Sequence, residues 1–230
     1  MGLVTIGVDV GQVKDPTAVC LCELDKDRYV VRFLQRLPLG TNYSLVAARL
    51  AEIHSGAVAR RMQERQIPDT GRLLTGRQLL GWTIPERFET ASSGVYMFVD
   101  RTGVGLPVCD LLREKIGAKN LCGINITGGD KRECSPHSKG GSVGKAYLVS
   151  RLQALLQPPK RIVLPETDEA RALGEELLNF EIRPTEDTNM IFGAFKAGTH
   201  DDLAIALGLA VLFDRAKLEP PKVTTFSRWR

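Results

Sequence analysis

The chain has 230 residues, 43% of them hydrophobic and 25% charged, a balance typical of a globular protein with enough apolar residues for a core. It has no apolar run of about 18 residues and no basic and apolar leader at its start, so the sequence predicts neither a membrane span nor a signal peptide. The net charge of +4 permits a polyanionic partner without requiring one, and five cysteines without a CxxC pair indicate reduced thiols in a cytoplasmic protein.

The first part of the chain predicts three strands and a helix. Residues 4–10, 18–24 and 29–36 are apolar or alternating and are joined by short turns, which favours an antiparallel meander. Residues 43–53 carry apolar side chains at helical spacing. Residues 54–94 follow as a long insertion whose arginines, interleaved with acidic residues, fit either DNA phosphates or a solvated helical face.

The rest of the chain alternates strands and helices. Strands are predicted at 95–99 and 121–126, with a short strand at 161–164, whereas the Gly-, Ser- and Lys-rich residues 127–144 predict a loop. Helices are predicted at 106–116, 145–157, 166–180 and 201–213. An antiparallel meander followed by alternating β and α units predicts an α/β fold with a mixed five-stranded sheet flanked by helices, as in an RNase H-like core.

Four aspartates occupy places where a carboxylate needs an explanation. Asp9 lies inside an apolar strand, Asp100 ends the next central strand, and Asp201 and Asp202 open the last apolar helix. Each has an ordinary alternative, because an aspartate can bond to a turn, cap a helix or interact with a helix dipole. Together they predict a cluster whose mutual repulsion requires cations, and hard oxygen ligands suit Mg²⁺ or Mn²⁺. Two such ions can activate a water and stabilise the leaving oxygen of a phosphodiester.

Several motifs resemble the nuclease domain of phage large terminase subunits. The resemblance is carried in order by residues 7–18, by 99–108 with its Asp-x-Thr-Gly-x-Gly turn, by 126–129, by 144–145, and by His-Asp-Asp before an alanine-rich helix at 200–207. It implies that Asp9, Asp100 and one or both of Asp201 and Asp202 are the ligands of two Mg²⁺ or Mn²⁺ ions. It also implies cleavage of double-stranded DNA during viral genome packaging, with the terminase ATPase domain, the small terminase subunit and the portal as partners.

The chain departs from the family pattern in two respects. The insertion at 54–94 is longer than the usual connection, and the packaging ATPase domain that precedes the nuclease in the full subunit is not present. We therefore expect a nuclease domain over residues 1–213 and a basic tail over 214–230, acting in the cytoplasm of a host cell.

Three basic residues are predicted to contact DNA: Arg101, Lys139 and Lys145. Residues 139–146 almost form a P-loop, but Lys139 replaces the first glycine and Ala146 replaces the hydroxyl residue, so nucleotide binding is not expected. Lys145 is predicted as a catalytic cation near the scissile phosphate, and its ordinary alternative is an exposed lysine that opens a helix.

The leading hypothesis is thus a metal-dependent endonuclease that cuts double-stranded DNA. Three alternatives remain at this point: an RNase H-like Holliday-junction resolvase, a nuclease-inactive DNA-binding packaging protein, and an actin-like ATPase. The intact set of aspartates argues against the inactive protein, and the length of 230 residues argues against the ATPase, which needs two such domains.

Overall fold

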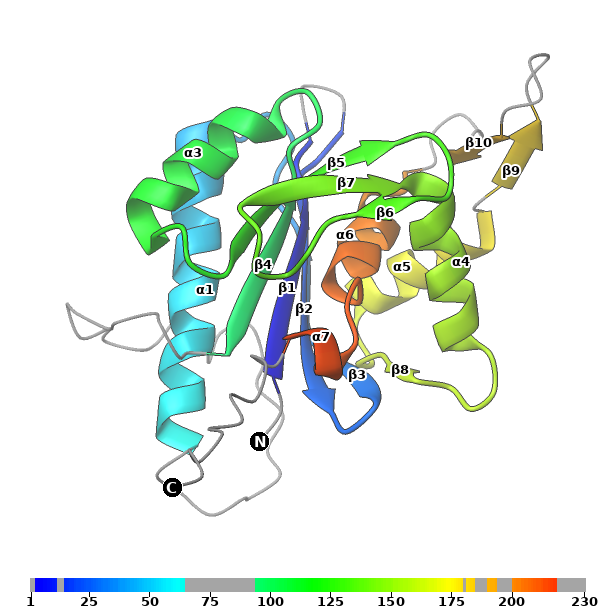
Figure 1. Ribbon diagram of the computed structural model, residues 1–230, viewed down its shortest axis with the longest axis horizontal. Coiled ribbons are helices and arrows are strands. Elements are labelled where there is room, and N and C mark those ends of the chain that lie inside the picture. The colour runs from blue at the N-terminus through cyan, green and yellow to red at the C-terminus, as the bar shows by residue number, and fades with distance from the viewer. Residues whose placement is uncertain are drawn as a thin grey trace, which may run out of the picture.

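A central sheet between two layers of helices forms the body of the protein (Figure 1). The computed structural model describes residues 3–11, 15–64, 94–179, 181–184, 190–193 and 200–218. Within these residues, the main sheet has eight strands in the order β6-β7-β5-β4-β1-β2-β3-β8.

The predicted mixed sheet is confirmed in the middle of this order. Strands β1 (Leu3–Asp9), β2 (Ala18–Asp25) and β3 (Arg28–Arg36) form the antiparallel meander. Strand β4 (Val95–Asp100) pairs in parallel with β1, and β5 (Leu121–Thr127) pairs in parallel with β4. The five strands β3-β2-β1-β4-β5 therefore have the RNase H-like arrangement.

Three strands extend the sheet beyond the five expected. β7 (Gly140–Gly144) pairs in parallel with β5, β6 (Arg132–Glu133) pairs with β7, and β8 (Ile162–Val163) adds to β3. The prediction that 127–144 is a loop was therefore wrong. The segment is held by pairing with β5, and only Val143 in β7 contributes a fully buried apolar side chain, so local composition gave no signal. A separate hairpin joins β9 (Glu181–Pro184) to β10 (Met190–Gly193).

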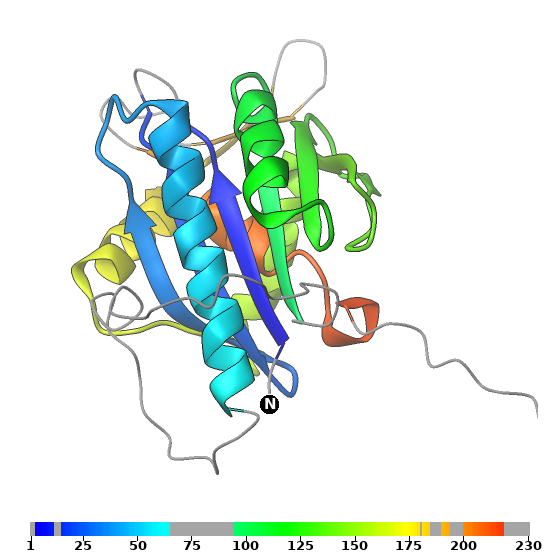
Figure 2. The same ribbon diagram turned by 90° about the vertical axis from the view of Figure 1, so that its left-hand side faces the viewer.

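One face of the sheet is covered by α1 (Tyr43–Glu64) and α3 (Gly105–Ile116), as Figure 2 shows. The helix predicted to end at residue 53 continues for three more turns, because Ala57 and Val58 extend its buried stripe past His54 and Gly56. The expected insertion therefore begins later than residue 54, and residues 65–93 lie outside the described part of the chain. None of the helices in the described part is long and apolar enough to cross a membrane.

The opposite face carries α4 (Lys145–Leu156), α5 (Asp168–Asn179) and α6 (Asp202–Ala210). Every residue of α6 is buried, and the helix lies directly on β1. A Cβ atom at Gly7 would lie 2.0 Å from the carbonyl oxygen of Ala206, so glycine is what allows this close approach.

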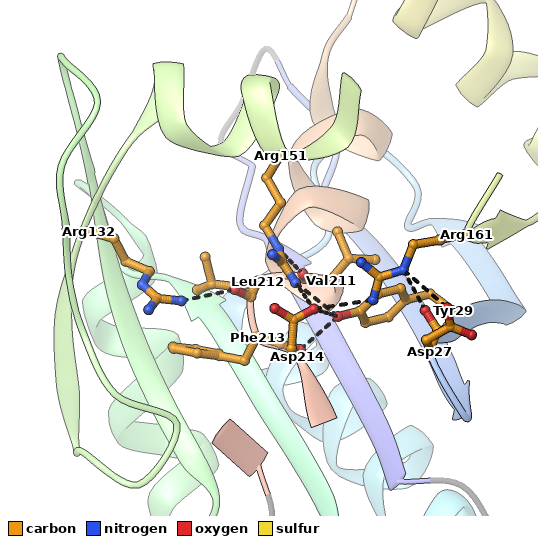
Figure 3. A network of polar contacts seen from close by, with 9 residues as sticks. All are labelled: Asp27, Tyr29, Arg132, Arg151, Arg161, Val211, Leu212, Phe213 and Asp214. Carbon is orange, nitrogen blue, oxygen red and sulfur yellow. Dashed lines mark hydrogen bonds and ion pairs between the residues drawn. The ribbon is translucent and has the colours of Figure 1, made fainter. Parts of the chain in front are cut away.

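The chain just after α6 is held by side chains from three other segments (Figure 3). Arg151 Nε donates to the carbonyl of Val211 at 2.5 Å, Arg132 donates to that of Leu212, and the Tyr29 hydroxyl donates to that of Phe213. A short helix, α7 (Arg215–Leu218), follows, and Leu218 is fully buried. The chain therefore stays packed against the body of the protein as far as residue 218.

Candidate functional site

The two strand-borne aspartates lie side by side at one edge of the sheet. Asp9 and Asp100 are the last residues of β1 and β4, and the residues before them, Val8 and Val99, are partners in parallel pairing. Val8 and Val99 point into the core beneath α1 and α3. Because side chains alternate along a strand, Asp9 and Asp100 point to the opposite face, where α6 lies.

The other two aspartates come from the beginning of α6. Asp201 is the N-cap residue of this helix and Asp202 is its first residue. Asp9, Asp201 and Asp202 line a cavity of about 260 Å³, together with Asp15 and the turn 102–104. The fold thus gathers four aspartates from three segments that are distant in sequence, although Asp100 lies beside the cavity and not in its lining.

Burial raises the pKa of the two strand-borne aspartates, and neighbouring carboxylates add to the shift at Asp9. The pKa of Asp9 lies well above its ordinary value, first because the side chain is buried and then because Asp100, Asp201 and Asp202 are near. Burial also raises the pKa of Asp100, although the bond from the backbone N–H of Thr102 at 2.8 Å and the charge of Lys145 oppose the shift. Holding several carboxylates together here is therefore unfavourable unless a cation is present.

Helix capping does not account for the positions of Asp100 and Asp201. Asp100 accepts its bond from the turn at Thr102, and α3 begins at Gly105 with no side-chain cap. Asp201 occupies the cap position of α6 but makes no capping bond. Its Oδ2 instead accepts a bond from Lys145 Nζ at 2.6 Å. The structure thus brings Lys145, the first residue of α4, to the aspartate cluster.

The donor set is suited to a hard divalent cation, because it consists of carboxylate oxygens at a polar cavity with excess negative charge. Among the described residues, however, no three His, Cys, Asp or Glu side chains converge closely enough to hold a metal ion as they are placed. Binding one ion to three of these carboxylates would therefore require their side chains to move closer together.

Solved structures with the same architecture are nuclease domains of large terminases. The large terminase nuclease of thermophilic phage G20c with bound magnesium has a TM-score of 0.56 at 22% identity, and the alignment covers 91% of this chain and 80% of that one. The nuclease domain of the Thermus phage P74-26 large terminase has a TM-score of 0.51 at 20% identity, covering 91% and 78%. This chain has the fold of a large terminase nuclease domain.

The same fold extends to an animal virus. A manganese-soaked human cytomegalovirus terminase nuclease domain has a TM-score of 0.53 at 13% identity, and the alignment covers 94% of this chain and 85% of that one. No protein-family model matches this chain, and no curated protein matches its sequence. The likeness to the terminase nucleases therefore concerns the fold.

All three basic residues predicted to bind DNA lie outside the lining of the cavity, although Lys145 bonds Asp201, which lines it. Arg101 Nε donates to Asn125 Oδ1 at 2.9 Å, and its side chain packs close to Gly140. Lys139 is exposed and immediately precedes β7, whereas Lys145 follows that strand. DNA contact by Arg101 and Lys139 stays a prediction.

Sequence reasoning missed the residues that surround Asp202. Arg36, the last residue of β3, donates from Nε to Asp202 Oδ2 at 2.6 Å and from Nη2 to Glu176 Oε1. Glu176 lies on α5 and its pKa is raised to about 7, chiefly by burial, against the bonds that it accepts from Ala204 and Arg36. A signal for Glu176 existed, because it continues the buried stripe of Ala170 and Leu173, where an apolar residue is expected.

Asp15 and His200 also lie at the cavity edge. Asp15, which follows β1 in the chain, lines the cavity. His200 Nδ1 is 3.7 Å from Asp15 Oδ1 and 3.6 Å from Asp202 Oδ1. The histidine lies near both carboxylates because the packing of α6 on the meander brings residues 15 and 202 together.

Proposed function

We propose that this protein is a metal-dependent endonuclease that cuts double-stranded DNA during viral genome packaging. The observation that carries the proposal is the aspartate cluster: Asp9 and Asp100 on neighbouring strand ends face Asp201 and Asp202 at the start of α6. The fold shared with the terminase nucleases, including the magnesium-bound phage G20c domain, supports the same function.

The proposed ligands of two Mg²⁺ or Mn²⁺ ions are Asp9, Asp100, Asp201 and Asp202. When bound, such ions supply a water made nucleophilic at neutral pH and stabilise charge on the leaving oxygen. Asp201 is more exposed than Asp202, whose side chain is 5% exposed and shares one oxygen with Arg36. We therefore assign Asp201 as the more available ligand and Asp202 as one that offers its remaining oxygen, Oδ1.

Lys145 is proposed to interact with the scissile phosphate. Its ammonium group lies 2.6 Å from Asp201 Oδ2, and this ion pair places the positive charge beside the aspartate cluster. A lysine acts on phosphate as a point charge and needs no planar geometry. Binding along the DNA is expected to rest on basic residues such as Arg101 and Lys139 and to weaken as salt rises.

The proposed setting is the cytoplasm of an infected host cell, with a packaging ATPase domain, the small terminase subunit and the portal as partners. Nucleotide turnover is not expected of this chain, because residues 139–146 lack the first glycine and the hydroxyl of a phosphate-binding loop. No feature of the described residues favours branched DNA as the substrate. The alternative of a junction resolvase is therefore addressed by including a four-way junction in the test.

The test is a cleavage assay with supercoiled plasmid, linear duplex and a four-way junction, each with Mn²⁺, Mg²⁺, Ca²⁺ or a chelator. We expect Mn²⁺ and Mg²⁺ to support cutting of plasmid and duplex without ATP. We expect little cutting with Ca²⁺, whose looser coordination positions the attacking water poorly. Failure to cut with any divalent ion would contradict the proposed enzyme, and cutting confined to the junction would favour a resolvase.

A further inference from the structure

The first turn of α6 is capped by a residue from another helix. The side chain of an N-cap aspartate ordinarily accepts a bond from the backbone N–H of the second or third helical residue. In α6 the third residue is Ala204, and its N–H donates at 2.8 Å to Glu176 Oε2 from α5. Asp201, at the N-cap position, makes no side-chain cap bond.

Glu176 is held in this place from the sheet. Its side chain is 5% exposed, and its second oxygen, Oε1, accepts a bond from Arg36 Nη2. Arg36 also bonds Asp202, so one guanidinium joins carboxylates from α5 and α6. The planar fork of arginine suits this bridging, and the positive charge offsets the repulsion between the two carboxylates.

The strand register explains why Arg36 reaches this point. Asp9 pairs with Ala18, and Ala18 pairs with Arg36, so the three residues form a row across β1, β2 and β3. Directly paired residues share a face of the sheet, so Arg36 lies on the face of Asp9 and α6. The small side chain of Ala18 between them, fully buried, leaves room for the start of the helix.

We propose that Glu176 is a positioning residue that takes over the capping of α6 and so leaves the carboxylate of Asp201 to Lys145 and the cavity. Without Glu176, the nearest local acceptor for the Ala204 N–H is Asp201 itself, which would turn back onto its own helix. The capping exchange can be tested in the metal-free protein, whereas its consequence for metal binding rests on the function proposed above.

Only a carboxylate fits both donors that meet at Glu176. An amide has one acceptor oxygen and one donor group, so Glu176→Gln satisfies either Ala204 N–H or Arg36 but not both. Glu176→Met keeps similar length and removes both bonds. Glu175→Met is the matched control, because Glu175 loses the same charge from the same helix on an exposed position.

The first arm is a double-variant cycle of thermal unfolding without metal, with Glu176→Met, Asp201→Ala and both together. We expect Glu176→Met to lower the midpoint and Asp201→Ala to change it little. The midpoint of the double variant is expected to fall by more than the sum of the two single-variant changes. The reason is that Asp201 takes over the cap only when Glu176 is absent. Additive effects would overturn the exchange of caps. If Glu176→Met does not fold, Glu176→Ala, which also removes both bonds but has a smaller side chain, takes its place in the cycle.

The second arm measures Mn²⁺ binding by calorimetry. We expect Glu176→Met to weaken the affinity by about tenfold or more, as the loss of residues that orient metal ligands does, and Glu175→Met to leave it unchanged. Equal affinities of these two variants would overturn the positioning role. If the wild-type chain binds no Mn²⁺, the proposed function fails, and the metal-free cycle still decides whether Glu176 is the cap.

Discussion

The two ends of α6 differ in the charged groups that surround them. At its beginning, Asp9, Asp100, Asp201 and Asp202 gather around a cavity, and the pKa of Asp9 is raised well above its ordinary value. Beyond its other end, Arg151 and Arg132 bond backbone carbonyls, and the pKa of Asp214 is lowered by bonds from Arg151 and Tyr29, although partial burial opposes the shift.

The contrast distinguishes a region whose contacts stabilise the fold from a region suited to bind a cation. Bonds from cations to the carbonyls just after the helix are stabilising, because these acceptors would otherwise lack a partner within the fold. A cluster of carboxylates is destabilising until a cation arrives. These bonds hold the chain at the C-terminal end of α6, and the same helix carries Asp201 and Asp202 at its start.

The largest expected effect is the loss of cleavage in Asp100→Asn. The asparagine oxygen can still accept the bond from Thr102 N–H, so the turn and the fold should persist. Removal of a ligand should lower Mn²⁺-dependent plasmid cleavage by more than the roughly 10- to 100-fold lost when an outer partner of a ligand is removed. Asp110→Asn, an exposed aspartate on α3, is the control. A folded Asp100→Asn protein that cuts at nearly the wild-type rate would remove this residue from the site.

The second prediction concerns the anchored end. Arg151→Met leaves the Val211 carbonyl and Asp214 without their bonds to Arg151, and we expect the free energy of unfolding to fall by about 2 kcal/mol, chiefly from the unpaired carbonyl. Chemical denaturation measures this loss. Arg171→Met, which breaks an exposed ion pair with Asp168, should lower stability by less than about 1 kcal/mol. Equal losses in the two variants would show that the contacts of Arg151 do not anchor the helix.

The smallest effect is a pH dependence at Asp214. Because its folded-state pKa is lowered, the carboxylate contributes stability above its unfolded pKa near 3.8, and this contribution is lost as pH falls through the folded value. In Asp214→Asn, the free energy of unfolding should therefore fall less than in wild type as the pH is lowered below about 4. The side chain is 52% exposed, so solvent screening limits the change to less than about 1 kcal/mol. A variant with the wild-type acid profile would contradict the assignment.

Strands and helices with a strong periodic pattern could be predicted from the sequence, and so could the aspartates placed against that pattern. Asp9 interrupts an apolar strand and Asp100 ends one, and both positions are local features. β7 could not be found in this way, because a glycine-rich strand depends on pairing with β5. The contact between Arg36 and Glu176 was also out of reach, because it joins residues 140 positions apart through tertiary packing.

The central claim is that the carboxylates at the start of α6 form one cation site, and Asp9→Asn tests it most directly. Thermal unfolding of wild type and variant is measured with and without Mn²⁺. The raised pKa of Asp9 means that its ionised form destabilises the metal-free fold, so the variant should unfold at a higher temperature than wild type without metal. Adding Mn²⁺ should stabilise wild type and leave the variant almost unchanged. A variant that is no more stable without metal, yet gains as much from Mn²⁺ as wild type, would contradict the claim.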